Sequence, residues 1–446
     1  MNKIVFFILL AIIPFIGINS QDAASVTGSP ESTFPMLKNK LKRSNEGVTD
    51  AKKSADSKFW LSRAELMMDI FNLHRQYLQK GAQQMTVTLL YQNPKDQKQW
   101  TDSDGHRYEE LIYETVKILI KDGVVDSFEE LEILHENPLS EALTSLEKAQ
   151  SLDTQGKQTK KIKDAYNTLK LRYQMLGVEK FYIPDFPASF HAFSAIDKIN
   201  QIPLMEGVVD TTFLYYAGMA ALRGDMNAEA IEYFEKAIEH NYPEPDAYVF
   251  LKMKYAEAGD TAKALSILEK GFKKYPSSEM ILRELINHYL FADKGAEAME
   301  YLKLAQKEDP TNLSYILAEG TLYDKMGDME KAKELYQKTI DMDPSFFDAY
   351  FNMGVIYYNK AYAMYKEAEK IRNPKEYGAM VDSADVILSQ SLPYMEKAHE
   401  LKPEDKPTLE TLKTLYYRMQ MNDKYEEVKL ELEALPDEAT KPGEIQ

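Results

Sequence analysis

The sequence predicts an all-α fold: a right-handed α-solenoid of stacked antiparallel helix pairs, with about 7–8 units and two insertions. Three residue types that recur every 34 residues lead to this prediction. They are Tyr255, Tyr289, Tyr323 and Tyr357; Ala230, Ala264, Ala298 and Ala332; and Pro276, Pro310 and Pro344. A fixed period of this length is typical of repeats in which each unit is one supersecondary element that stacks on its neighbours.

One period, 245–278, shows how each part of the unit favours a helix pair. Tyr255 lies on the apolar face of the first helix and fills the space towards the next unit. Gly259 marks the turn, because glycine accepts the left-handed conformation at a helix end. Ala264 is small where the two helix backbones come closest, and Pro276 closes the unit. A single pair cannot bury its own apolar face, so the units must stack.

These positions resemble those of the tetratricopeptide repeat (TPR). Two departures occur: Leu214 and Ala221 stand where aromatic residues are usual, and Asp293-Lys294 replaces a Gly-Asp turn. The resemblance implies a solenoid whose first helices line a concave groove. It also implies protein binding, without naming the partner.

Longer segments resemble exported TPR proteins of the Bacteroides group of Gram-negative bacteria. These segments are the N-terminal apolar stretch that ends in Ser20-Gln21, WLSRAELMMDI at 60–70, LPYMEKAHELKPED at 392–405 and LYYRMQMNDKYEEV at 415–428.

Composition narrows the class of partner. The 446 residues carry a formal net charge of −17, which argues against nucleic acid and against anionic lipid, because like charges repel. Cysteine is absent from the sequence, which excludes disulfides, thiolate metal sites and cysteine nucleophiles. We therefore expect a protein or peptide partner and no nucleic acid.

The first twenty residues are typical of a secretory signal. Lys3 precedes the uncharged run Ile4 to Ile18, which is shorter than the roughly 20 apolar residues of a membrane span. We predict cleavage near Ser20 or Gln21 and no tight membrane insertion afterwards; an uncleaved anchor is the alternative. A lipoprotein would need a cysteine after this run, so the expected location is periplasmic or outer-membrane-associated.

The rest of the chain is interpreted in order. The predicted segments are a signal peptide 1–20, a flexible leader 21–57, degenerate N-terminal TPR-like units 58–199 with an insertion near 80–135, regular units 200–345, C-terminal units 346–435 with lengthened helices near 361–391, and a polar tail 436–446. Apolar spacing predicts helices over 59–78, 140–153, 160–181 and 188–199. Within the insertion, Met85 to Tyr91 suggests a short strand, and helical spacing resumes from Leu111 to Ile120.

Motifs for chemistry are missing from the sequence: HExxH, a phosphate loop, GxGxxG and GxSxG do not occur. We therefore predict no catalytic residues, no cofactor and no metal site, and hence no enzyme. The alternative is a secreted hydrolase or carbohydrate-active protein with its chemistry in the 80–135 insertion. Only Trp100, His106 and several acidic residues favour that alternative.

The favoured hypothesis is an exported scaffold that binds a protein or peptide in its concave groove, possible roles being assembly of an envelope or secretion complex. Carried over slot by slot from the TPR resemblance, the groove residues form what we name the groove row. It comprises Tyr215, Met219, Leu222, Arg223, Val249, Met253, Arg283, Asn287, Leu290, Phe291, Leu317, Lys325, Phe351, Asn352, Val355 and Tyr358. The row is largely apolar, and methionine and aromatic residues adapt to a bound segment. The alternative is that some of these side chains pack against the neighbouring first helix.

Overall fold

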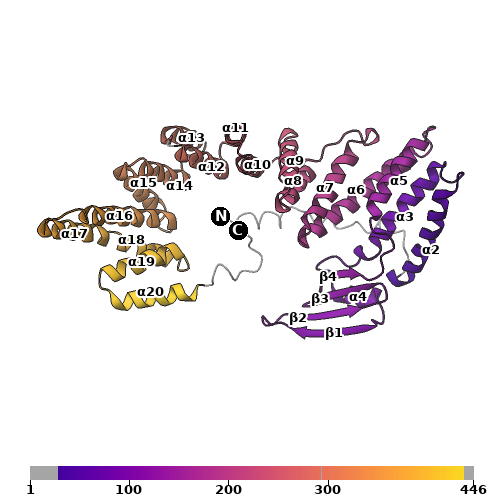
Figure 1. Ribbon diagram of the computed structural model, residues 1–446, viewed down its shortest axis with the longest axis horizontal. Coiled ribbons are helices and arrows are strands. Elements are labelled where there is room, and N and C mark those ends of the chain that lie inside the picture. The colour runs from indigo at the N-terminus through magenta and orange to yellow at the C-terminus, as the bar shows by residue number, and fades with distance from the viewer. Residues whose placement is uncertain (1–28, 293, 436–446) are drawn as a thin grey trace. The chain divides into compact units, whose positions relative to one another are not determined.

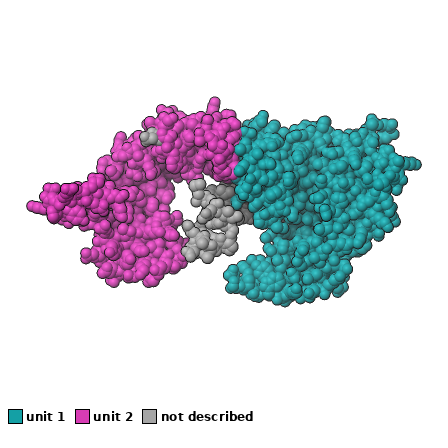
Figure 2. Space-filling model, viewed as in Figure 1, with its two compact units in different colours: residues 1–242 teal, residues 243–446 magenta. Residues whose placement is uncertain are grey.

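The computed structural model describes residues 29–292 and 294–435. The predicted signal peptide and the polar tail from 436 lie outside these residues. The chain forms two compact units, residues 1–242 and 243–446, shown in different colours in Figure 2. Each unit is described by itself.

The first unit contains helices and one small sheet. Its elements are α2 (Pro30–Thr49), α3 (Ser57–Arg75), α4 (Gln84–Leu90), β1 (Asp96–Thr101), β2 (Arg107–Ile112), β3 (Val116–Lys121), β4 (Val124–Glu130), α5 (Pro138–Leu152), α6 (Thr159–Tyr182), α7 (Phe186–Asn200), the short 3-10 helix η1 (Pro203–Met205), α8 (Thr211–Arg223) and α9 (Asn227–Glu239). The pairs are α3 with α5, α6 with α7, and α8 with α9. The helices predicted over 59–78, 140–153, 160–181 and 188–199 are confirmed as α3, α5, α6 and α7.

The predicted flexible leader is wrong for residues 30–49, which form α2. Ser29 caps this helix by accepting a hydrogen bond from the Ser32 N–H at 3.3 Å. Phe34, Leu37 and Leu41 recur at helical spacing and are buried, and α2 packs on α3. The many polar residues between them hid this apolar face in the sequence.

The segment 80–135, hereafter the sheet insertion, lies in the chain between α3 and α5, which pack together as a pair. It holds a four-stranded antiparallel sheet in the order β1-β2-β3-β4, together with α4. Both local predictions inside it are wrong. Residues 84–90 are helical, and the stretch from Leu111 to Ile120 lies in β2, the following turn and β3.

The burial pattern of β3 explains why the helical prediction from Leu111 to Ile120 is wrong. Val116, Ile118 and Ile120 on β3 are buried while their neighbours are half-buried, which is the period of two expected of a strand. Asp122-Gly123 then turns the chain into β4 with both residues at positive φ, 50° and 84°. An Asp-Gly pair is a strong hairpin signal in a sequence, and it outweighs the apparent helical spacing here.

The second unit is also built of helix pairs. Its elements are α10 (Asp246–Glu257), α11 (Thr261–Lys274), α12 (Glu279–Phe291), α13 (Gly295–Glu308), α14 (Leu313–Lys325), α15 (Met329–Met342), α16 (Phe347–Ala368), α17 (Pro374–Ser389), α18 (Leu392–Leu401), α19 (Lys406–Arg418) and α20 (Asn422–Ala434). The pairs are α10 with α11, α12 with α13, α14 with α15, α16 with α18, and α19 with α20. With the three pairs of the first unit, the described residues contain eight, within the predicted range. Figure 1 shows α10, α12 and α14 on the inner side of the curve of this unit, and α11, α13 and α15 on its outer side.

The repeated positions take the predicted places in these pairs. Ala230, Ala264, Ala298 and Ala332 are all buried. Gly259 and Gly327 end first helices with φ of 79° and 85°. The aspartate after each glycine caps the second helix: Asp260 accepts from the Lys263 N–H at 3.0 Å and Asp328 from the Lys331 N–H at 3.3 Å.

The second interruption, near 361–391, differs from the prediction in one respect. The first helix of this pair, α16, is lengthened to 22 residues as expected, but the second helix, α18, has only 10. The extra residues form a separate helix, α17, that packs on α16. Pro374 begins α17 and Pro393 lies in the first turn of α18, and each proline prevents a helix from running through. Throughout 29–292 and 294–435, none of the helices combines the length and the apolar character needed to span a bilayer.

Candidate partner-binding surface

The part of the groove row in the first unit is mostly buried. On α8, Tyr215 is 5% exposed and Met219 is 1% exposed. The Tyr215 ring stacks on the ring of Tyr242 with centroids 4.4 Å apart. The expectation that these two side chains face solvent is therefore wrong: they pack inside the helix pair. Leu222 is half-buried, and Arg223 is exposed.

In the second unit, the groove row is most exposed on α12. Val249 and Met253 on α10 are half-buried. On α12, Arg283 and Asn287 are exposed, Leu290 is half-buried, and Phe291 is 93% exposed at the end of the helix. These side chains follow one another at three- and four-residue steps, so they share one face of α12. Lys325 on α14 is also exposed.

The rest of the row packs against neighbouring helices to a large extent. Leu317 on α14 contacts a buried cluster that includes Tyr336 and Met353. Phe351, Val355 and Tyr358 on α16 contact another cluster, formed by Ala361, Leu388, Met395, Leu409, Leu412, Leu415, Tyr416 and Val428. Asn352 is half-buried. On α14 and α16, the side chains of the groove row therefore pack against neighbouring helices, which was the alternative to a surface open to solvent.

Hydrogen bonds to one carboxylate join α12 to the second helices α11 and α13. Tyr289 on α12 and Tyr301 on α13 both donate hydrogen bonds to Glu269 Oε1 on α11, at 3.0 and 3.1 Å. The two rings stack with centroids 5.5 Å apart. Burial, and next the hydrogen bond with Tyr301, raise the pKa of Tyr289, so its hydroxyl stays protonated as a donor. Three helices are therefore fixed at one carboxylate.

An ion pair joins the two first helices beside the row. Lys252 Nζ on α10 lies 2.8 Å from Glu284 Oε2 on α12, and both side chains are largely shielded from water. The pair links α10 to α12. Arg283, Asn287 and Lys325 add exposed hydrogen-bond donors around Met253, Leu290 and Phe291. An apolar strip with such donors can hold a peptide segment by its side chains and its carbonyl or carboxylate oxygens.

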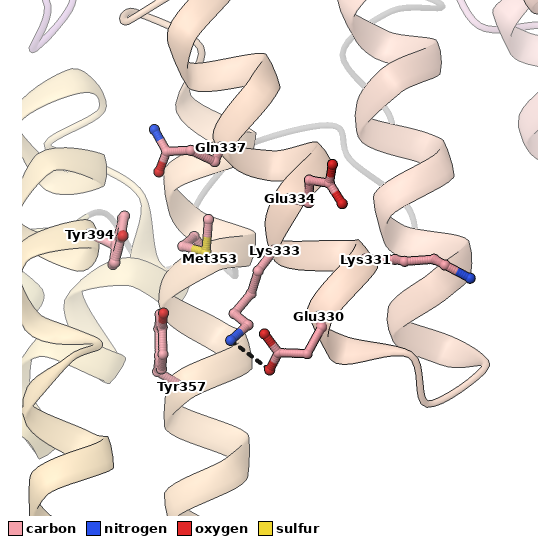
Figure 3. Close-up of a pocket in the computed structure, with 8 residues that line it drawn as sticks. All are labelled: Glu330, Lys331, Lys333, Glu334, Gln337, Met353, Tyr357 and Tyr394. Carbon is pink, nitrogen blue, oxygen red and sulfur yellow. Dashed lines mark ion pairs between the residues drawn. The ribbon is translucent and has the colours of Figure 1, made fainter.

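A separate open pocket lies between α15, α16 and α18. It measures about 490 Å³ and is lined by Glu330, Lys331, Lys333, Glu334, Gln337, Met353, Tyr357 and Tyr394. Figure 3 shows Lys333 turned towards Glu330, its partner at 2.8 Å, while Lys331 points away from the tyrosines. The rings of Tyr357 and Tyr394 stack at 5.9 Å, and burial raises the pKa of Tyr394. These contacts join α15, α16 and α18, so packing of the helix pairs accounts for them.

The residues that favoured chemistry in the sheet insertion have structural partners. His106 Nδ1 lies 2.8 Å from Asp122 Oδ2, and Asp122 Oδ1 accepts a hydrogen bond from the Arg107 N–H at 2.9 Å. This exposed contact ties the β1–β2 turn to the β3–β4 turn. Trp100 lies on β1 beside Tyr108. Over the described ranges, no group of three or more His, Asp and Glu side chains is arranged to hold a metal ion.

Sequence reasoning missed the sheet, and with it one open strand edge, β1. Two hairpin signals could have found it: Asp104-Gly105 between β1 and β2, and Asp122-Gly123 between β3 and β4. Both glycines have positive φ, 85° and 84°.

The fold and the groove row define a class, the α-solenoid repeat proteins. Family models described as tetratricopeptide repeat and TPR repeat match residues 213–244 and 320–361. The first match covers α8 and α9, and the second runs from the end of α14 through α15 into α16. The chain thus contains tetratricopeptide repeats, as its 34-residue spacing predicted.

Individual relatives are distant. The photosystem I assembly protein Ycf3 of Rippkaea orientalis is 32% identical over 111 residues, which cover 24% of this chain and 58% of that protein. The chain spans between 49% and 58% of the length of the curated relatives it matches. Among solved structures, the human IFIT1 dimer with m7Gppp-AAAA is 17% identical with a TM-score of 0.35, covering 67% of this chain and 65% of IFIT1. A TPR repeats protein from Bacteroides fragilis is 20% identical with a TM-score of 0.26, covering 56% and 98%.

Proposed function

We propose that this chain is a scaffold that binds a protein or peptide partner on the inner face of α10 and α12. The observation that carries the proposal is Phe291, a large aromatic side chain that is 93% exposed. It shares a helix face with Arg283, Asn287 and Leu290. Exposed aromatic anchors surrounded by donors are typical of interaction surfaces rather than of a solvated face. The name of the Ycf3 relative, an assembly protein, supports the same class of role.

The groove is tested by the introduction of negative charges at its apolar members. Met253→Asp and Phe291→Asp together should abolish capture of partners in a crosslinking pull-down from the native envelope. Buried aspartates in an interface lack compensating charges, so the loss should exceed tenfold, or about 1.4 kcal/mol. The matched control is Leu304→Asp with Met342→Asp, which changes two exposed apolar residues on the second helices α13 and α15. The control should keep capture, and both variants should keep the helical circular-dichroism signal.

Capture of the same partners by the Met253 and Phe291 double variant would overturn the groove. Loss of capture in both double variants would point to a general effect of added charge instead. Either result would remove the inner face of α10 and α12 as the binding site.

We further propose that the chain is exported and acts in assembly of an envelope or secretion complex. Support comes from the sequence of residues 1–20, with its uncharged run and small polar end. Expression of the full-length sequence in a Gram-negative host, followed by fractionation and intact-mass measurement, should give a periplasmic or membrane-associated product that begins near Gln21 or Asp22. A full-length mass in the cytosolic fraction would contradict export.

A further inference from the structure

The two edges of the sheet in the sheet insertion are treated differently by the fold. The start of β4 is paired on its outer side with residues 81–84, which lead into α4. Gly81 N–H donates to Val125 O at 2.7 Å, Val125 N–H donates to Ala82 O at 2.8 Å, and Gln84 N–H donates to Gly123 O at 3.0 Å. The other edge is β1, and every one of its six residues is exposed. Figure 1 draws β1 as the outermost strand of this sheet.

The alternation of hydrogen bonds between β1 and β2 shows which backbone groups of β1 point away from the sheet. Residues 96–101 pair with β2 in antiparallel register, and Asp102 N–H donates to His106 O at 3.0 Å. Bonding alternates along an antiparallel strand, so Lys98 and Trp100 face β2 while Gln99 and Thr101 face away from it. Gln97 also faces away, and its N–H is bonded to Asp96 Oδ1 at 2.9 Å. An unpaired strand edge of this kind is a template for another strand.

One face of the sheet carries a stack of side chains that runs towards the open edge. Lys121 on β3, Tyr108 on β2 and Trp100 on β1 are direct cross-strand neighbours. Lys121 Nζ lies 5.4 Å from the centre of the Tyr108 ring. The Tyr108 and Trp100 rings are nearly parallel, with centroids 5.3 Å apart. The stack ends at Trp100, which is 44% exposed. A strand added at β1 would place one side chain on the outer face of the indole.

The charge of the sheet insertion indicates which kind of segment could add to β1 as a strand. The sheet insertion contains six basic and eleven acidic residues, a net charge of −5 within a chain of −17. The lysines at β1 already have partners: Lys95 pairs with Glu114, and Lys98 lies 3.8 Å from Glu110. A second copy of this chain would bring the same negative charge to the edge. A basic segment would be attracted to it, and an arginine or lysine would also form a cation–π contact with the indole.

We propose that β1 is a docking edge for an extended basic peptide segment of a partner protein, which adds to the sheet as a fifth strand. Backbone bonds from Gln99 and Thr101 hold the segment, and an arginine or lysine of the segment lies on Trp100. This site is separate from the inner face of α10 and α12, so either site can fail without the other.

The probe is a fluorescein-labelled peptide of alternating arginine and threonine, titrated against the full-length protein by fluorescence anisotropy. A peptide of alternating arginine and proline carries the same charge but lacks half of the backbone donors. We expect the arginine–threonine peptide to bind at least about tenfold more tightly, because lost backbone bonds at an edge cost about that much. A peptide of alternating glutamate and threonine should not bind.

The decisive variant is Gln99→Pro. Proline at this position removes an outward N–H and leaves the bonds between β1 and β2 intact, because Gln99 faces away from β2. Binding should fall at least about tenfold, whereas Gln99→Ala, the matched control, should bind within about threefold of the wild type. Trp100→Thr replaces the indole with a β-branched residue that also favours a strand, so it should weaken binding as well. Circular dichroism and thermal unfolding should match the wild type in all three variants.

Tryptophan emission gives a second readout. The sequence has two tryptophans, and Trp60 is buried in α3. In a Trp60→Phe background, emission therefore reports Trp100 alone, and it should shift on addition of the arginine–threonine peptide.

Three results would overturn the proposal. The first is equal binding of the arginine–proline peptide, which would leave only charge attraction. The second is undiminished binding by Gln99→Pro. The third is concentration-dependent self-association of the wild type in sedimentation experiments that Gln99→Pro abolishes, since the occupant of the edge would then be a second copy.

Discussion

Single glycines set how closely the helices of a pair approach. Gly320 on α14 lies against Tyr336 of α15, and an added Cβ would come within 2.7 Å of the tyrosine ring and 3.3 Å of the Leu335 Cβ. Tyr336 is fully buried, so the ring has no room to move. The same residue type at Gly378 in α17 faces open space.

This contrast gives a prediction with an internal control. Gly320→Ala should destabilise the protein by about 1–2 kcal/mol, because overpacking costs about 1–3 kcal/mol and helix propensity returns about 0.5–1 kcal/mol. Gly378→Ala should stabilise by about 0.5–1 kcal/mol, since only the propensity changes. Urea unfolding followed by circular dichroism measures both. Equal effects of the two changes would show that α14 and α15 are not packed at Gly320.

A buried histidine links the sheet insertion to the helix stack. His74 near the end of α3 is 1% exposed, and its Nδ1 lies 2.9 Å from the Tyr91 hydroxyl. Burial, and next the charge of Arg75, lower the pKa of His74 from 6.5 to about 4. The unfolded chain therefore binds a proton on this residue at a higher pH than the folded chain does.

Because the pKa of His74 is lower in the folded chain than in the unfolded chain, the free energy of unfolding falls as the pH falls. Well above pH 6.5, His74 is neutral in both states, so it does not affect stability there. As the pH falls from about 6.5 to about 4, only the unfolded chain gains the proton, and up to about 3 kcal/mol of stability is lost. The difference in unfolding free energy between the wild type and His74→Gln should therefore change across this window and level off on either side. A difference that is flat from pH 7 to pH 4 would contradict the buried, neutral histidine.

At the scale of elements, one arginine holds the sheet insertion on the stack. Arg75 Nη1 lies 3.0 Å from Glu130 on β4, and Arg75 Nε lies 2.9 Å from Glu179 on α6. Its guanidinium also lies over the rings of Phe71 and Phe128, at 4.7 and 5.5 Å. The side chain is only 16% exposed, so these contacts are shielded from water.

Removal of this charge should loosen the insertion. Arg75→Met keeps the apolar stem but leaves Glu130 and Glu179 without their partner, which should cost about 1–3 kcal/mol. The control is Lys80→Met, since the Lys80–Asp126 pair at 3.2 Å in the same insertion has a lysine side chain that is 67% exposed. That change should cost less than about 1 kcal/mol. Thermal unfolding ranks the two variants, and the reverse order would contradict the role of Arg75.

At the scale of the molecule, the stability of each helix pair in a solenoid depends mainly on the adjacent pairs. Replacement of the sheet insertion by a short Gly-Ser linker of about four residues should destabilise the α3–α5 pair while leaving residues 243–435 folded. Hydrogen exchange should show unchanged protection in α12 to α16. Capture by the inner face of α10 and α12 should persist, and binding of the basic peptide should disappear. Lost protection in α14 or α16 would contradict this independence.

The predictable parts of the fold are those fixed by local repetition. Ala264 and Gly259 recur because each pair needs a small contact residue and a left-handed helix end, and the stack follows from them. The sheet insertion has no such period, so α4 and the strands were misassigned. For the groove row, slots taken from the family could not tell Tyr215, which is buried, from Phe291, which is open, because the difference depends on the ring of Tyr242.

The sequence by itself determined the class of repeat and the helix pairs of the solenoid, because short-range spacing dictates which residues face a neighbouring helix. Only the tertiary structure decided that the first interruption contains a sheet whose β1 edge is open, and that the most exposed part of the groove row lies on α12. Exposure depends on contacts between residues far apart in the chain, and a single sequence does not report those contacts.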